Sequence, residues 1–255
     1  MEITPERLKI IAGKEGFNII MIEKDYLLTY LLYLLRDIKG IYFKGGTALH
    51  KVILNHERLS EDLDFTLTRS VKEVKSDIGA VLKNTIFDKI TYGRDLDNFT
   101  RLIIHYKLFH EEGKIFIDLN EKAKLMLKPK HYSINHFYNE IIPNFSVACL
   151  DEKELLAEKV RAAATRYRAR DYADLYFIIK AGRIIDLSIV EKKFKSDNAE
   201  FTKVDIFKNT NKICKNWNKD LSQVLKRSLD FKEVMNTLAD YFDLKSEKEK
   251  MRLHF

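Results

Sequence analysis

Two short stretches of sequence decide the fold: residues 43–49 read FKGGTAL, and residues 58–65 read RLSEDLDF. An apolar run leads into Gly45 and Gly46, which predicts a short strand, a tight turn and then a helix from Thr47 to Leu54. Glycine lets a backbone come close to a ligand, and the free N–H groups at a helix start attract anions. The turn therefore suits a phosphate group, although a Gly-Gly pair at such a turn often does nothing beyond turning the chain.

The second stretch contains two aspartates, Asp62 and Asp64, separated by Leu63. Polar and apolar residues alternate over residues 62–67, which predicts a strand with one buried face. Both carboxylates then project from the same side of the strand, about 7 Å apart. They repel each other unless a cation lies between them, and Mg²⁺ prefers such oxygen ligands. The alternative is a solvent-facing strand with ordinary surface acids.

A third carboxylate, Asp118, stands within the apolar run Ile115 to Leu119. A lone buried carboxylate is costly without a partner, and a metal site shared with Asp62 and Asp64 would supply one. An acid at the end of a strand, exposed to solvent, is the other interpretation.

The remaining sequence divides near residue 150, without a flexible linker. Before this point helical and strand patterns alternate, and after it the strand signal fades. Helices are predicted from Thr4 to about Gly16 and at 21–36, 70–87, 152–166, 171–180, 187–194 and 221–241, and strands at 102–108 and 114–119 with a hairpin turn at Glu111–Gly113.

Composition excludes several classes of protein. The 255 residues contain 45% hydrophobic side chains, 9 Gly, 3 Pro and 2 Cys, so disordered, collagen-like and disulfide-scaffold proteins are ruled out. Cys149 and Cys214 show no metal-binding spacing, which argues against a zinc module and fits a reducing cytoplasm. The N-terminus is acidic and polar, unlike a secretory signal, and the longest apolar stretch, Tyr26 to Leu35, is about half of a membrane span. We therefore expect a cytoplasmic protein without a membrane partner.

The formal charge of +7 comes mainly from the second part of the chain. Residues 151–255 contain 23 basic and 18 acidic side chains, so the excess there is +5. The basic residues of this part suit an RNA backbone, and ordinary solvated helices explain them at least as well: Lys203, Lys208, Lys212, Lys215, Lys219, Lys226 and Arg227.

Taken together, a Gly-Gly turn, a DxD strand and a later acidic strand resemble nucleotidyltransferases of the polymerase-β type. Residues 43–49 and 58–65 are similar to the AbiEii/AbiGii toxin family of these enzymes, as are LLAEKVRA at 155–162 and RARDYADL at 168–175. The resemblance covers about residues 20–180. Arg170 is a departure, because the family has lysine there, which keeps the charge but changes its shape.

The resemblance implies an α+β fold: a nucleotidyltransferase domain at 1–150 with a mixed sheet flanked by helices, and a helical bundle at 151–255. It implies a Mg²⁺-dependent enzyme, with two ions, that transfers a nucleoside monophosphate from an NTP to a hydroxyl, such as a tRNA 3′ end. Such proteins are toxins of toxin–antitoxin or abortive-infection systems, with a cognate antitoxin. The carried-over roles are metal binding (Asp62, Asp64, Asp118), catalysis (the same three with Lys159 and Asp174) and binding of the triphosphate (Lys44, Gly45, Gly46, Thr47, Arg58, Lys159).

Two other functions remain open at this point. The chain is either a catalytically inactive module of the same fold that binds RNA or protein, or an enzyme that nucleotidylates protein. The three intact carboxylates argue against an inactive module. The sequence identifies neither the NTP, the acceptor, the antitoxin nor the oligomeric state.

Overall fold

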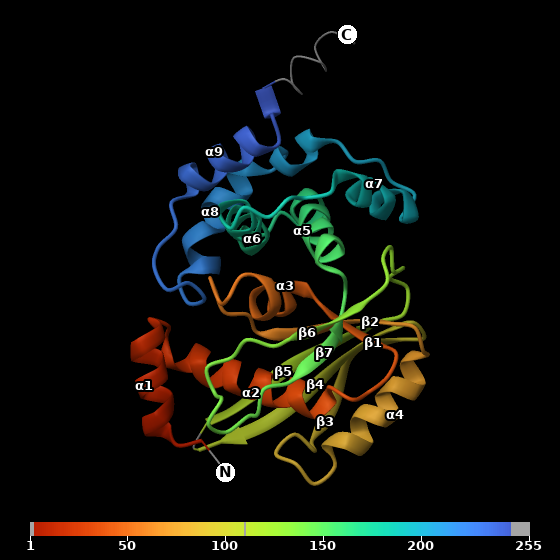
Figure 1. The fold of residues 1–255 in the computed structure, drawn as a ribbon, viewed down its shortest axis with the longest axis vertical. Helices are drawn as coiled ribbons and strands as arrows, with labels where there is room; N and C mark the ends of the chain where they lie inside the picture. Colours follow the sequence, from red (N-terminus) through yellow and green to blue (C-terminus); the bar gives the residue numbers. More distant parts are fainter. Residues whose placement is uncertain (1–2, 110, 246–255) are drawn as a thin grey trace. The chain divides into compact units, whose positions relative to one another are not determined.

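A computed structural model describes residues 3–109 and 111–245, without the side chain of Glu111. The chain divides into two compact units, Met1–Asp151 and Glu152–Phe255. Figure 1 shows the first unit as a sheet with helices and the second as helices.

In the described part of the first unit, seven strands form one mixed sheet in the order β3-β4-β5-β2-β1-β7-β6. The central strands β2 and β5 are parallel, whereas β1 and β4 run antiparallel to them. The strands are β1 (Ile41–Lys44), β2 (Asp62–Leu67), β3 (Ile90–Leu96), β4 (Phe99–Leu108), β5 (Glu111–Asn120), β6 (Lys130–Ser133) and β7 (Ser146–Cys149). Leu63 and Phe65 on β2 and Ile117 on β5 are at most 2% exposed, so the residues that alternate with them lie on the opposite face.

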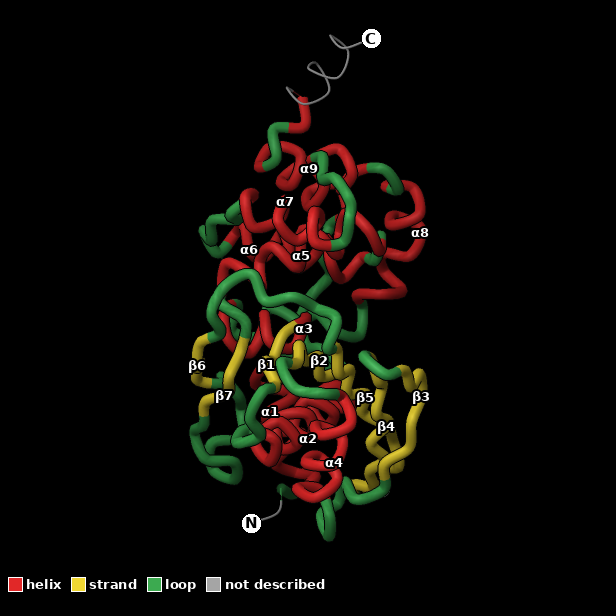
Figure 2. The backbone as a smooth tube through the Cα atoms, turned by 90° about the vertical axis from the view of Figure 1, so that its right-hand side faces the viewer, coloured by secondary structure: helices red, strands yellow, loops and turns green. Residues whose placement is uncertain are grey.

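The helices of the first unit begin and end at residues that cap them. In α1 (Pro5–Glu15), the Thr4 side chain accepts a hydrogen bond from the first turn and Gly16 ends the helix in a left-handed conformation. In α4 (Val71–Leu82), Ser70 and Glu73 form a capping box. The others are α2 (Ile19–Leu35) and the short α3 (Gly45–Ala48), which continues into a π-helical turn (Leu49–Ile53). Figure 2 shows α1, α2 and α4 lying together against the sheet.

A buried ion pair anchors the π-helical turn to α2. Lys51 is 1% exposed, and its ammonium lies 2.7 Å from the carboxylate of Asp25. It also donates a hydrogen bond to Thr29 (2.9 Å), while the Tyr138 hydroxyl donates to the second carboxylate oxygen of Asp25 (3.1 Å). Since each buried polar group is paired, this network fixes the segment that follows the Gly-Gly turn.

The second unit is helical throughout its described residues. Its helices are α5 (Glu152–Arg166), α6 (Ala169–Lys180), α7 (Leu187–Ser196), a 3-10 turn (Lys203–Phe207), α8 (Thr210–Leu221) and α9 (Phe231–Tyr241). Helix α5 packs against α6 and α7, and α6 packs against α8 and α9. The buried Tyr172 hydroxyl lies 2.9 Å and 2.6 Å from the carbonyls of Ala163 and Ile206, which ties α6 to α5 and to the 3-10 turn.

Several sequence-based boundaries are wrong, for identifiable reasons. The β4–β5 hairpin exists, but Glu111–Gly113 lie within β5, because the register places Ile104 opposite Ile115 and buries both. The predicted helix at 221–241 begins only at Phe231, where Asp230 caps α9 by accepting a hydrogen bond from the Glu233 N–H (2.8 Å).

Other elements differ from the expectation as well. The predicted helix at 70–87 ends at Leu82, and the helix expected from Thr47 begins at Gly45. Strands β3, β6 and β7 and helix α8 were not predicted.

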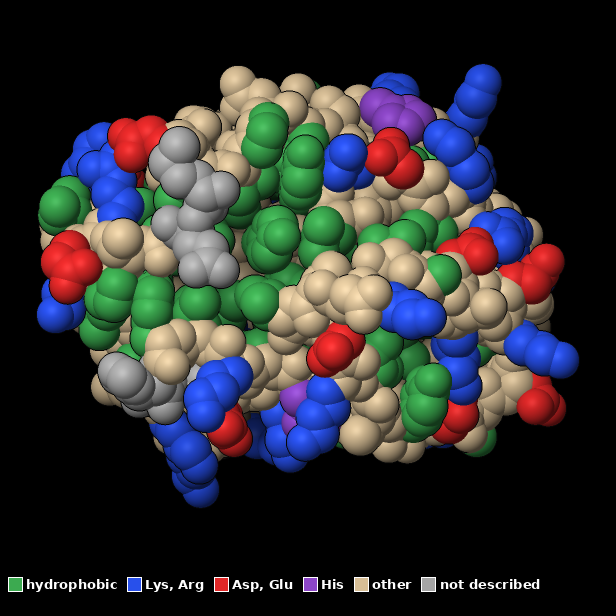
Figure 3. Space-filling view, turned by 90° about the horizontal axis from the view of Figure 1, so that it is seen from below, with side chains coloured by type: hydrophobic (Ala, Val, Ile, Leu, Met, Phe, Trp, Pro, Cys, Tyr) green, Lys and Arg blue, Asp and Glu red, His purple; other side chains and the backbone are tan. Residues whose placement is uncertain are grey.

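The surface contains exposed large apolar side chains, including Ile10 and Ile20. Figure 3 shows hydrophobic side chains gathered among charged ones on one face of the molecule. No helix within residues 3–109 and 111–245 has the length and hydropathy needed to cross a membrane.

Candidate active site

Charged residues form a row across four neighbouring strands of the first unit. Lys44 on β1 pairs with Asp64 on β2, Asp64 pairs with Asp118 on β5, and Asp118 pairs with Arg101 on β4. Directly paired residues project to the same face of a sheet, and neighbouring strands lie about 4.8 Å apart. Asp62 lies two residues before Asp64 and therefore shares this face. The fold thus brings together the three aspartates that the sequence singles out.

The Gly-Gly turn lies directly against the second of these aspartates. Gly45 has φ +80°, a conformation that side chains disfavour. A Cβ atom at this position would lie 2.1 Å from Oδ2 of Asp64, so no residue other than glycine fits without displacing that carboxylate. The backbone at the start of α3 therefore approaches the carboxylate closely, in the way needed for both to contact one ligand.

Thr47 makes a second connection between the turn and β2. Its buried hydroxyl donates a hydrogen bond to the backbone carbonyl of Asp62. The side chain thus ties the turn to the start of β2.

Asp62 has a carboxyl group with an unusually high proton affinity. Burial, and then the neighbouring charge of Asp64, raise its pKa from 3.8 to about 6. The charge of Lys24, which lies 3.2 Å from Glu61, acts in the opposite direction without cancelling the rise. The cluster therefore has an excess of negative charge that a proton or a cation relieves.

Asp118 already has a cationic partner. Its two oxygens accept hydrogen bonds from Nε and Nη2 of Arg101, each 2.7 Å long. This fork, and then the charges of the three aspartates, raise the pKa of the Arg101 guanidinium. Arg101 is the residue that sequence reasoning missed.

These observations test whether the site fits a divalent cation. Asp62 and Asp64 provide hard oxygen ligands from one face of β2, so these two residues fit Mg²⁺. Within the described ranges, no group of three or more His, Cys, Asp or Glu side chains is arranged to hold a metal.

Arg58 lies in a different environment from the one expected of a phosphate ligand. It is 2% exposed, and its guanidinium donates to the carbonyl of Leu59 (2.8 Å). The prediction that Arg58 neutralises triphosphate charge stays a prediction, and in the structure the buried side chain bonds within the loop before β2.

In the second unit, Lys159 on α5 is buried between two carboxylates of α6. Its ammonium lies 2.7 Å from Asp174 and 3.5 Å from Asp171, and the three side chains are 10%, 0% and 8% exposed. Positions 171 and 174 are one helical turn apart, so both carboxylates face the same ammonium. Asp174 therefore orients Lys159 through a charge pair, and Asp171 is a second partner.

The profile of one protein family, "Nucleotidyl transferase AbiEii toxin, Type IV TA system", matches residues 27–243 of this sequence. The chain belongs to the AbiEii family. It is thus a nucleotidyltransferase toxin of a type IV toxin–antitoxin system, a membership that implies an NTP substrate and an antitoxin partner. The family resemblance and the enzyme class expected from the sequence are confirmed.

Solved structures share the fold of this AbiEii-family chain. MenT4, a nucleotidyltransferase toxin from Mycobacterium tuberculosis, is similar with a TM-score of 0.69 and 20% identity, over 94% of this chain and 89% of that one. JHP933 from Helicobacter pylori gives a TM-score of 0.60 and 21% identity, over 93% and 98% of the two chains. A comparison with curated protein sequences gave no match. The α+β fold, with a mixed sheet, flanking helices and a helical C-terminal part, is confirmed.

Proposed function

We propose that this toxin is a Mg²⁺-dependent enzyme that transfers a nucleoside monophosphate from an NTP to a hydroxyl group of RNA, such as a tRNA 3′ end. The observation that carries the proposal is the contact between Gly45 and Asp64, beside Asp62. It joins a turn suited to phosphate to a pair of carboxylates suited to a divalent cation. We assign this chemistry to a domain at 1–150 and a supporting role to the helical domain at 151–255.

The carboxylates hold the metal. Asp62 and Asp64 bind it from one face of β2, and Asp118 completes the set from β5 when two ions are present. Bound Mg²⁺ would stabilise negative charge on the transferring phosphoryl group and on the leaving pyrophosphate. Asp118 also aligns the acceptor hydroxyl. In the transfer, the acceptor oxygen bonds to the α-phosphorus, the bond from this phosphorus to pyrophosphate breaks, and the hydroxyl proton passes to the carboxylate cluster.

The turn at the start of α3 binds the triphosphate. Gly45, Gly46 and Thr47 present backbone N–H groups, because the first turn of a helix leaves such donors free. Lys44 precedes them at the end of β1 and adds positive charge on the face that carries Asp64.

Lys159 is the cation of the second unit that we assign to the triphosphate. Its two aspartates hold the ammonium in one position. Asp174 is a positioning residue in this assignment.

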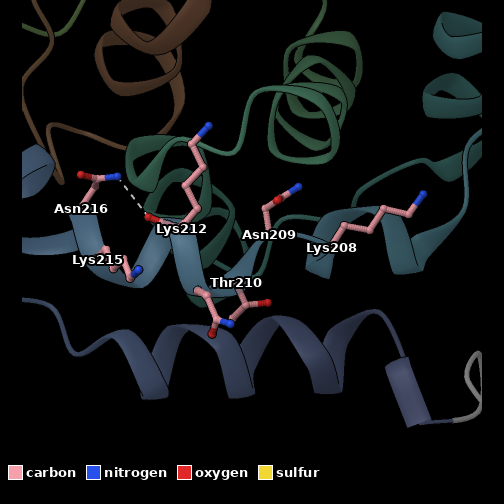
Figure 4. A pocket seen from close by; sticks show the side chains of 7 residues that line it. Lys208, Asn209, Thr210, Lys212, Lys215 and Asn216 are labelled. Carbon is pink, nitrogen blue, oxygen red and sulfur yellow. Dashed lines mark hydrogen bonds between the residues drawn. The ribbon is translucent and has the colours of Figure 1, made fainter.

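A basic pocket in the second unit favours RNA over protein as the acceptor. A pocket of about 660 Å³ at the start of α8 is lined by Lys208, Lys212 and Lys215 with three asparagines and Thr210. Figure 4 shows Lys208, Asn209 and Lys212 extending toward the same side. No Asp or Glu of the described residues lines it, although Lys208 pairs with Asp205 outside the lining. Lysines and amides without carboxylates suit a phosphodiester backbone.

We propose that the toxin acts in the cytoplasm. The proposed RNA acceptor is found there, and the two free cysteines fit a reducing compartment.

Labelled NTPs test the proposed function. The wild-type protein is incubated with each α-³²P-labelled NTP, Mg²⁺, total RNA and cell extract, and the products are separated into RNA and protein. We expect label in RNA from one preferred NTP, and none with D62N or D64N. D88N removes a carboxylate from an exposed position of the same unit and serves as the matched control.

Three outcomes would contradict the proposal. Label in protein would establish the alternative acceptor. No transfer, together with no Mg²⁺-dependent NTP binding by calorimetry, would establish an inactive binding module. Unchanged transfer by D62N or D64N would remove these residues from the reaction.

A further inference from the structure

Arg101 holds the third carboxylate of the cluster in a defined geometry. The guanidinium and the carboxylate meet through two parallel hydrogen bonds of 2.7 Å, the fork arrangement in which arginine binds carboxylates most strongly. Asp118 is largely buried, and Arg101 is 42% exposed on its outer side.

The surroundings of Arg101 support this position. Its guanidinium lies over the ring of Phe116, 5.2 Å from the centroid. On the other neighbouring strand stands Gly93, where a Cβ atom would lie 3.5–3.6 Å from three carbons of the Arg101 side chain. An aromatic face on β5 and a glycine on β3 thus flank the arginine while Asp118 binds its charged end.

The fork changes what Asp118 can offer to a cation. Each carboxylate oxygen has already accepted one charge-assisted hydrogen bond, so fewer lone pairs and less negative charge remain for a metal. Asp62 and Asp64 project from one face of β2, two residues apart and beside the turn at Gly45.

We propose that Arg101 is a positioning residue that controls access of a divalent cation to Asp118. The protein without nucleotide binds one divalent cation at Asp62 and Asp64, and Asp118 accepts a second cation only when the fork opens. The exposed side of Arg101 gives it solvent into which to move. This inference rests on the metal site of the proposed function.

The test counts metal ions without measuring transfer. Mn²⁺, a paramagnetic substitute for Mg²⁺, is titrated into the full-length protein in the absence of nucleotide, and free Mn²⁺ is followed by electron paramagnetic resonance. The wild type should bind one ion tightly. R101Q should bind a second ion about 10- to 100-fold more tightly than the wild type does, the range expected for hydrogen bonds to a charged group.

Two variants separate the fork from the simple loss of a positive charge. R94Q removes the same charge from β3, where the Arg94 guanidinium lies over the Phe99 ring, and should titrate like the wild type. R101K keeps the charge but cannot form the fork, and its second ion should bind with intermediate affinity. If R101K matches the wild type while R101Q gains affinity, charge alone accounts for the effect and the proposal is overturned.

A double variant establishes whether Asp118 receives the second ion. R101Q/D118N should lose the gain seen in R101Q and return to one ion. A second ion that persists in the double variant, or the same stoichiometry and affinity in R101Q and the wild type, would overturn the proposal. Circular dichroism verifies that each variant is folded. The double variant D62N/D64N reports separately on the proposed function: if it still binds the first ion, the metal site is wrong, whatever Arg101 does.

Discussion

Replacing Gly45 by alanine probes the contact on which the proposed active site depends. The backbone at this position has φ +80°, and an alanine there costs about 1–2 kcal/mol of stability. The new Cβ would lie 2.1 Å from Oδ2 of Asp64, whereas ordinary contacts begin at 3.4 Å. The carboxylate must therefore move by about 1.3 Å (3.4 − 2.1), and a misplacement of about 1 Å in an active site costs about 100-fold in rate.

Two other glycines are matched controls for the two effects of this substitution. Gly182 has φ +66°, and a Cβ atom added there would have nothing within 4 Å. G182A should therefore lose only the stability that the left-handed backbone conformation costs, without a steric clash. Gly79 lies within α4 with nothing within 4 Å and an ordinary φ, so G79A should stabilise the protein by about 0.5–1 kcal/mol. Urea denaturation gives the stability of each variant, and transfer from labelled NTP gives its activity.

Stability and activity must respond differently in G45A if Asp64 belongs to the active site. G45A should lose about as much stability as G182A but about 100-fold more activity. If G45A transfers nucleotide within threefold of G182A, Asp64 tolerates displacement and the contact with Gly45 is not part of the site. If G45A fails to fold, or loses far more stability than G182A does, the close approach of Gly45 to Asp64 serves the fold and not the reaction.

Three further predictions concern charges. Folding raises the pKa of Asp62 from 3.8 to about 6, so the ionised carboxylate destabilises the folded state, by an amount that grows as the pH rises from about 3 to about 6. D62N should therefore exceed the wild type in stability by up to about 3 kcal/mol at pH 7.5 in metal-free buffer, and a thermal melt near pH 3 should show no difference. Since Asp174 is 0% exposed and bound to Lys159, D174N should lower the free energy of unfolding by about 3 kcal/mol, and a loss below 1 kcal/mol in urea would mean that Asp171 alone satisfies the lysine. K212Q/K215Q should weaken RNA binding and reduce the slope of log affinity against log salt by about 1.4, whereas an unchanged slope in fluorescence anisotropy would place the RNA elsewhere.

Features encoded by neighbouring residues were predictable from the sequence. The strand before Gly45 and the alternation around Asp62 and Asp64 depend on local conformation and on a period of two, so both are visible in a short window. The exposed strand β3 lacks that signal, since almost none of its side chains faces a core. Strands β6 and β7 have four residues each, too few for a period to stand out.

Interactions between distant strands were harder to predict. Arg101 and Asp118 are opposite each other only in the observed register of β4 and β5, and a turn at Glu111–Gly113 would move them apart. Burial of apolar pairs across the hairpin, rather than the glycine, sets that register. The burial of Arg58 is likewise absent from any local pattern, since a charged side chain next to a polar loop segment is normally exposed.

The absence of a side chain at position 45 also has a genetic consequence. Every base change in the first two positions of a glycine codon that keeps a sense codon introduces a side chain, and each of these would strike the carboxylate of Asp64. A single nucleotide change at this codon is therefore enough to displace the Asp64 carboxylate, on which the proposed activity depends. We expect survivors of toxin expression to carry this codon altered more often than that of Gly79, where a side chain meets open space.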